Sequence, residues 1–150
     1  MYESIYAKLS EINTCYQEIH RLGEEIYELL KEKKVQATQS LNTLQLQKIE
    51  QLKGLQTALG NTIHTYCKEK QVQPAKIKSL LPLFTEKEAD HLKTMQQQVV
   101  EIEAETRKIL LQNQYYVTVL LKTTESMIDC ISELNLERNH NSQIFMNELL

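Results

Sequence analysis

Glycine, proline and large aromatic residues are scarce in this chain, which has three Gly, two Pro, two Phe and no Trp among 150 residues. Turns and strand connections rely on Gly and Pro, so a β-rich or mixed fold with many tight turns is not expected. The chain is rich instead in Leu, Ile, Glu, Lys and Gln, which favour helix. Because 41% of the residues are hydrophobic, there are enough apolar side chains to pack helices together. We therefore expect an all-α protein.

Long apolar runs are also missing. No window approaches 18 uninterrupted apolar residues, so no membrane span is predicted. The first residues, 1–4, carry neither a basic region nor an apolar run, so no signal peptide is expected. The three cysteines, Cys15, Cys67 and Cys130, lie far apart and form no CxxC pair. Such a set is typical of reduced thiols, and we expect a cytoplasmic protein.

The sequence lacks the signals of nucleic-acid binding and of catalysis. A net charge of −3, from 17 basic and 20 acidic residues, leaves no dense basic face for a nucleic acid. There is no GxGxxG or GxxxxGK[ST] motif, and each cysteine lies inside a predicted helix, where we predict no catalytic triad. We predict no enzymatic activity and no cofactor.

Two Glu-x-x-His pairs are the strongest candidates for a metal site. They are Glu88 with His91, and Glu137 with His140, and the spacing matches that of ligands in di-iron helical bundles. The pairs lie at opposite ends of one predicted helix, so they could not share a metal cluster within one monomer. We predict no metal site, and a helical metalloenzyme is the least favoured function.

Apolar residues recur at helical spacing in a first segment, 2–32, and resume in a second, 37–69. Gly23 takes the seam position between Ile19 and Ile26, which we interpret as a close helix crossing or a tolerated weak point in the helix. The second seam is out of phase with the first. Either a turn at 33–37 separates two helices, or one long helix drifts in phase. We favour the turn, because two helices of about 50 Å pack more readily against a long partner.

A third helix is predicted from 86 to 136, after a capping box formed by Thr85 and Glu88. A short helical piece near 75–81 precedes it. A helix of about 50 residues is about 75 Å long and cannot cover its own apolar stripe, so the other helices must do so. The prediction is an elongated antiparallel bundle of three long helices, forming a single domain of residues 1–150 whose last part, 137–150, is a flexible tail.

Two motifs lie on these predicted helices. One is a leucine and lysine pattern that opens the second helix after an acidic, leucine-rich stretch: Leu41-x-x-Leu44-x-x-x-Lys48-x-x-x-Leu52-x-x-Leu55, preceded by Glu24-Glu25 and Leu29-Leu30. The other carries an asparagine and is followed by aliphatic residues: Leu110-Leu111-Gln112-Asn113, then Val119-Leu120-Leu121. Together with the order of the helices, these motifs resemble the FlgN family of flagellar export chaperones.

The resemblance implies a cytoplasmic type III export chaperone that binds the C-terminal helical region of hook-associated proteins and delivers them to the flagellar export apparatus. The resemblance also implies that the chaperone binds its clients through an amphipathic C-terminal part of the chaperone chain. On this chain the implied client-binding residues are Asn113, Tyr116, Leu120, Leu121, Met127, Ile128, Ile131 and Leu134, with Ile144 and Phe145 beyond them.

An amphipathic helix does not reveal which partner covers its apolar face, so alternatives stay open. The wide apolar surface is equally well explained if the first two helices cover it, or if two copies of the chain associate through it. The competing function is therefore a structural helical scaffold or adaptor that forms a homodimer through the long C-terminal helix. Asn113 falls on the seam itself, where it either specifies register or partner, or is bonded to a neighbour or water at the seam edge.

Overall fold

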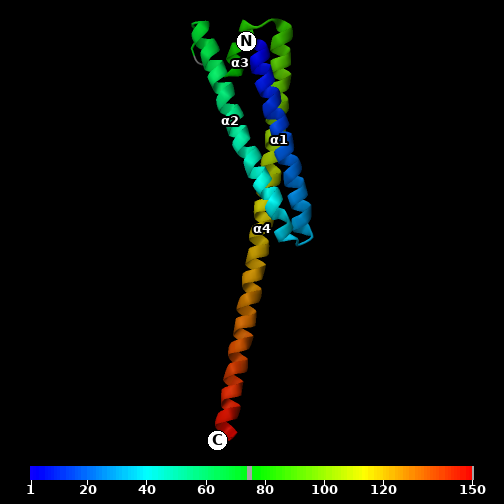
Figure 1. The fold of residues 1–150 in the computed structure, drawn as a ribbon, viewed down its shortest axis with the longest axis vertical. Coiled ribbons are helices and arrows are strands. Elements are labelled where there is room, and N and C mark those ends of the chain that lie inside the picture. Colours follow the sequence, from blue (N-terminus) through cyan, green and yellow to red (C-terminus); the bar gives the residue numbers. More distant parts are fainter. Residues whose placement is uncertain (74–75, 150) are drawn as a thin grey trace. The chain divides into compact units, whose positions relative to one another are not determined.

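The computed structural model describes residues 1–73 and 76–149, and the side chains of 1–73 and 76–134. Four helices follow one another along the chain: α1 (Tyr2–Lys31), α2 (Gln39–Glu69), α3 (Ile77–Leu80) and α4 (Glu86–Leu149). Two 3-10 turns, η1 (Val35–Thr38) and η2 (Leu81–Leu83), connect them (Figure 1). No strand occurs in the described residues. The all-α prediction, with long helices that form a bundle, is confirmed.

A turn separates α1 from α2, as favoured from the sequence. Lys33 takes a positive φ of 60°, and its backbone N–H donates to the Leu30 carbonyl at 3.0 Å. The N–H of Lys34 donates to the Leu29 carbonyl at 2.9 Å, which completes a Schellman motif. This motif usually has glycine at the positive-φ position. Lysine stands there instead, so the sequence carries no turn residue at this boundary.

The end of α2 repeats the same geometry. Gln71 has a φ of 54° and donates its N–H to the Lys68 carbonyl at 3.2 Å, while Val72 donates to Cys67 at 3.0 Å. The short piece predicted at 75–81 is found as α3 followed by η2. Residue 75, where this piece was expected to begin, lies outside the described residues.

The start of α4 confirms the predicted capping box. The Thr85 backbone N–H donates to Oε2 of Glu88 at 2.9 Å, and the Glu88 N–H donates back to the Thr85 hydroxyl at 3.4 Å. The predicted end at 136 is wrong, because α4 continues to Leu149. The asparagine-rich segment after 136 has low helix propensity, yet it extends a helix that has already formed. The flexibility of 137–150 stays a prediction.

The chain divides into two compact units, Met1–Asn113 and Gln114–Leu150. Whether residues 1–150 behave as a single domain stays a prediction. In the first unit, α1 and α2 run antiparallel, since Gln45 of α2 bonds to the carbonyl of Ile19 and Gln56 bonds to the Tyr16 hydroxyl.

In the same unit, α1 and the first part of α4 run parallel, side by side in Figure 1. Tyr2 and His91 share a hydrogen bond of 3.1 Å, and the side chain of Thr106 donates to the carbonyl of Tyr16. The paired residues are separated by 89 and 90 positions, so the two helices stay in register. Consecutive long helices therefore alternate in direction, as an antiparallel bundle requires.

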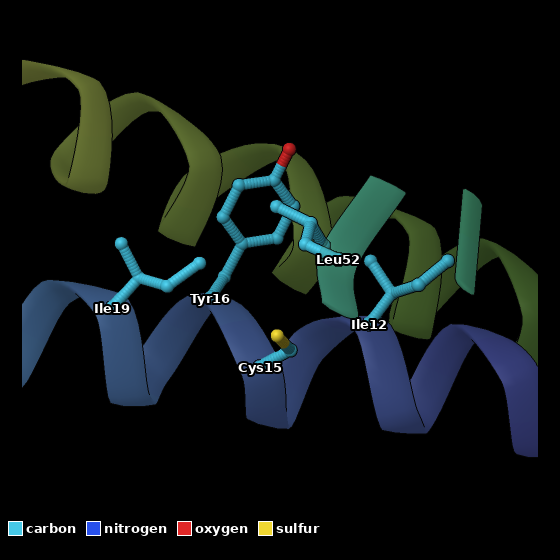
Figure 2. Close-up of a cluster of buried hydrophobic side chains, with 5 residues drawn as sticks. All are labelled: Ile12, Cys15, Tyr16, Ile19 and Leu52. Atoms are coloured by element: carbon cyan, nitrogen blue, oxygen red, sulfur yellow. The ribbon is translucent and has the colours of Figure 1, made fainter. Parts of the chain in front are cut away.

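Helix α1 supplies most of the core of the first unit. Every turn of its seam is buried, from Ile5 to Leu30. Its middle forms the largest core cluster, in which Tyr16 and Ile19 pack with Leu52 of α2 (Figure 2). The thiol of Cys15 lies in the same cluster and donates to the carbonyl of Lys48 at 3.3 Å. Burial raises the pKa of this thiol, which keeps it protonated and unreactive.

Aromatic side chains pack together at the end of the bundle where α1 and α4 begin and α2 ends. Tyr66 of α2 stacks on Phe84 with ring centroids 5.5 Å apart and an interplanar angle of 11°. Phe84 also meets Tyr2 edge to face at 6.4 Å. These contacts join the start of α1, the end of α2 and the segment before α4. They hold the beginning of α4 in place.

Candidate functional site

The candidate client-binding residues of the second unit lie on one stretch of α4, from Tyr116 to Leu134. Five of them, Leu121, Met127, Ile128, Ile131 and Leu134, are 56–64% exposed. Tyr116 and Leu120 are half-buried. We call these seven residues the C-terminal apolar stripe. Their predicted role in client binding stays a prediction.

The stripe follows from helical spacing. Tyr116, Leu120, Met127, Ile131 and Leu134 are separated by four, seven, four and three positions, so they lie on one face of α4. Leu121 and Ile128 each follow a member of that row and widen the face on one side. The stripe is therefore broader than a narrow coiled-coil seam.

Three of the four charged side chains of this stretch lie on the opposite face. Lys122, Asp129 and Glu133 each stand two positions after a stripe residue, which is a rotation of about 200° around the helix. All three are exposed. The fourth, Glu125, stands four positions after Leu121 and three before Ile128, so it borders the stripe on the side that these two residues widen. A partner that docks on the stripe would meet apolar contacts along it and the Glu125 carboxylate at one edge.

Asn113 is placed differently from the stripe. It belongs to the first unit, is only 8% exposed, and its amide Nδ2 donates to the carbonyl of Gly23 on α1 at 2.8 Å. Its Oδ1 atom is buried without a hydrogen-bond partner in the structure. Asn113 therefore joins α4 to α1 as the last residue of the bundle. Its predicted contact with a client stays a prediction, and its direct role in the structure is to hold this register.

Two further buried polar residues share this role and were not singled out from the sequence. Thr106 donates to the carbonyl of Tyr16 at 3.3 Å, and Gln45 of α2 donates to the carbonyl of Ile19 at 3.1 Å. With Asn113, they bond carbonyl oxygens on one face of α1. The signal that could have found Thr106 is its spacing of seven from Asn113 along the seam of α4.

Gly23 makes this close approach possible. A Cβ at residue 23 would lie 2.8 Å from Cγ2 of Ile109, 3.2 Å from its Cγ1 and 3.4 Å from Nε2 of Gln45. No side chain fits there without displacement of Ile109. The interpretation of Gly23 as a close helix crossing is confirmed.

Further exposed apolar residues extend the candidate surface. Val117 precedes Leu121 by four positions and lies on the same side of α4, and it is exposed. Tyr115 and Val119 are also exposed but lie away from the stripe. Sequence periodicity did not mark Val117, because it falls between the rows that define the seam.

The first Glu-x-x-His pair has structural partners. Glu88 accepts hydrogen bonds from Thr85, and His91 is bonded to Tyr2. The second pair, Glu137 with His140, lies outside the described side chains. Among those that are described, no group of three or more His, Cys, Asp or Glu residues is arranged to hold a metal ion.

No helix, over its described residues, has an apolar stretch long enough to cross a membrane. Comparisons with curated proteins and with solved structures each found no match. The family model described as FlgN protein matches residues 1–141, which is nearly the whole chain. The resemblance seen in the leucine, lysine and asparagine motifs is thereby confirmed: the chain belongs to the FlgN family of flagellar export chaperones.

Proposed function

We propose that this protein is a cytoplasmic chaperone that binds the C-terminal helical region of hook-associated proteins along its C-terminal apolar stripe and delivers them to the flagellar export apparatus. The observation that supports this proposal is the exposure of Leu121, Met127, Ile128, Ile131 and Leu134 on one broad face of α4. Family membership supports the class of client.

The physical basis is the burial of apolar surface. A client helix laid along α4 would cover side chains that are now more than half exposed, and each would contribute about 1–2 kcal/mol. The stripe offers anchors at the i, i+4, i+7 spacing that such a helix can match. Met127 adds a flexible, polarisable side chain that adapts to different clients.

The competing occupant is a second copy of α4, as in a self-associating scaffold. Analytical ultracentrifugation of the protein alone distinguishes the two. The chaperone proposal expects a monomer that forms a heterodimer when the client peptide is added. A stable homodimer that does not dissociate with the peptide would favour the scaffold.

Ile131→Asp tests the stripe directly. A carboxylate there would be buried by the client, so the affinity for a C-terminal peptide of a hook-associated protein should fall by about tenfold or more. Because Ile131 is exposed, the melting temperature and helical circular dichroism should be unchanged. The measurement is isothermal titration calorimetry on the full chain.

The matched control is Ser126→Asp, which adds the same charge to an exposed position on the other side of α4. Its affinity should stay within about twofold of the wild type. Equal losses for Ser126→Asp and Ile131→Asp would contradict the proposal. Unfolding of Ile131→Asp would show instead that the residue belongs to an internal core.

A further inference from the structure

The apolar surface of the second unit consists of two rows that run side by side along α4. Five residues at spacings of four, seven, four and three form the primary row: Tyr116, Leu120, Met127, Ile131 and Leu134. Three residues that each follow a member of the primary row by one position form the side row: Val117, Leu121 and Ile128. One position is a rotation of about 100° around a helix, so the two rows face different directions.

One neighbouring helix covers only one of these directions. A coiled-coil pair buries a narrow seam, with two apolar positions in seven, whereas a helix with several neighbours in a bundle has a wider apolar face. Both rows are open to solvent, since Leu121 of the side row is 60% exposed and Met127 of the primary row is 62% exposed. A single client helix seated on the primary row would leave the side row in water.

The first unit shows how this chain covers a face of similar width. There Ile102 and Leu110 of α4 pack against a core cluster that contains residues of α1 and Leu52 of α2. These two α4 residues are eight positions apart, which turns them about 80° from each other on the helix. Two helices, α1 and α2, therefore cover this part of α4 together.

The primary row continues the spacing of that covered seam. Asn113, Tyr116 and Leu120 are separated by three and four positions along the same helix α4. Asn113 is buried and hydrogen-bonded to α1, whereas the rows that follow it have no cover over the described side chains. The pattern that α1 and α2 satisfy before Asn113 is thus repeated after it without them.

Further copies of this chain are a poorer source of two helices than a client is. In the first unit, α1 and α2 bury apolar faces in shared core clusters with α4. A copy would therefore contribute mainly its own C-terminal apolar stripe, and two more copies would be needed to cover both rows. One client segment that folds back on itself supplies both helices.

We infer that the C-terminal region of the hook-associated client binds as a helical hairpin, with one helix on the primary row and the other on the side row. This inference rests on the proposed client binding and adds the form of the bound client. The hairpin completes a three-helix bundle in the second unit, as α1 and α2 do with α4 in the first. From Tyr116 to Leu134 the helix rises about 27 Å, so each client helix needs about 20 residues, and the hairpin about 45 with its turn.

The test compares a client segment of this length with its two halves. Isothermal titration calorimetry on the full chain measures binding of the last 45 or so residues of a hook-associated protein and of each half, about 20 residues long. We expect the whole segment to bind at least about tenfold more tightly than either half, because each half buries only one row. Far-ultraviolet circular dichroism should show that about 40 client residues become helical on binding, since the free segment is too short to fold alone.

Variants of the side row identify the second helix. Val117→Ser combined with Leu121→Ser should weaken the whole segment by about tenfold or more, and should leave the half that binds the primary row within about twofold. The matched control is Val119→Ser, an exposed valine away from both rows, which should leave both affinities within about twofold. Valine and serine have similar helix propensity, so the two valine variants differ only in what the client covers. If the double variant melts below the wild type, Val117→Ser alone replaces it, with an expected loss of about threefold.

Three results would overturn the hairpin and leave the proposed function standing. One is a half that binds within about threefold of the whole segment while only about 20 client residues become helical. Another is an equal effect of the side-row variant and Val119→Ser. The third is a homotrimer of the protein alone in analytical ultracentrifugation that dissociates when Leu121→Ser is introduced, since further copies would then cover both rows. If neither the whole segment nor a half binds at about 1 mM, the proposed function fails and the hairpin with it.

Discussion

Gly23 provides the sharpest test of how the bundle is held together. The chain has three glycines, all in helices, and the same substitution to alanine should have opposite effects at different positions. A Cβ at residue 23 would lie 2.8 Å from Cγ2 of Ile109, while a Cβ at Gly54 or Gly60 meets nothing within 4 Å. The three variants therefore share one change in helix propensity and differ only in packing.

The magnitudes follow from two opposing contributions to the free energy of unfolding. Alanine is favoured over glycine in a helix interior by about 1 kcal/mol, so Gly54→Ala and Gly60→Ala should each stabilise the protein by up to that amount. At Gly23 the same gain is offset by overpacking against Ile109, which costs about 1–3 kcal/mol. If α4 is displaced, the bond from Asn113 to the Gly23 carbonyl is weakened too, at about 1 kcal/mol.

We therefore expect Gly23→Ala to be less stable than Gly54→Ala by about 1–4 kcal/mol. Urea denaturation followed by far-ultraviolet circular dichroism measures the difference, since m should be the same in all variants. A Gly23→Ala variant as stable as Gly54→Ala would refute the close crossing. Relief by Ile109→Val in the double variant would locate the strain at the predicted contact.

Two further predictions concern the ends of helices. Lys33→Gly should stabilise the protein by about 1 kcal/mol in urea denaturation, because Lys33 has a φ of 60°. The control is Lys34→Gly, at a φ of −89°, which should not stabilise the protein. Equal effects of the two substitutions would contradict the positive φ of Lys33. Hydrogen bonds from the Thr85 hydroxyl and backbone amide hold the pKa of Glu88 below its ordinary 4.5. The ionised Glu88 carboxylate therefore stabilises the fold above pH 4.5, and this stabilisation is lost as the pH falls through the lowered pKa. The stability difference between wild type and Glu88→Ala, measured by thermal melts across the acid range, should shrink there, and Glu86→Ala should show a smaller pH dependence; identical profiles would count against the capping box.

The sequence predicted those parts of the fold that local chemistry determines. The capping box at Thr85 gave the start of α4, and the phase change after residue 32 indicated the turn into α2. The turn itself could not be recognised by its residues, because Lys33 and Gln71 occupy positions where glycine is usual. Tertiary packing of the flanking helices holds these residues at positive φ against their own preference.

Pairing between distant positions was the part that sequence could not provide. Asn113 was noted as a polar residue on the seam, but its partner is the backbone carbonyl of Gly23, 90 positions away. Every residue has a backbone carbonyl, so no pattern of side chains shows which carbonyl accepts the hydrogen bond. The same holds for Thr106 and Gln45, whose partners are also carbonyls of α1.

The end of α4 was placed too early for a related reason. Low helix propensity after 136 predicted the end of the helix, although no proline or capping residue stops it there. The residues of the C-terminal apolar stripe, in contrast, were named as the client-binding residues that the resemblance to the FlgN family implies, and five of them are exposed in the structure. Its partner stays a proposal, since an exposed face is compatible with more than one occupant.

The continuity of α4 through Asn113 has a consequence for the energetics of docking. An isolated helix must first form a nucleus, an event with an equilibrium factor of about 10⁻³, before each further residue adds favourably. In this chain the helical nucleus lies in the packed first unit, where α4 is hydrogen-bonded to α1 as far as Asn113, the last residue of that unit. The stretch that carries the stripe only has to propagate from it. A partner that docks on the stripe as proposed would therefore meet a helix that is already wound, and the backbone entropy of helix formation would fall on that partner alone.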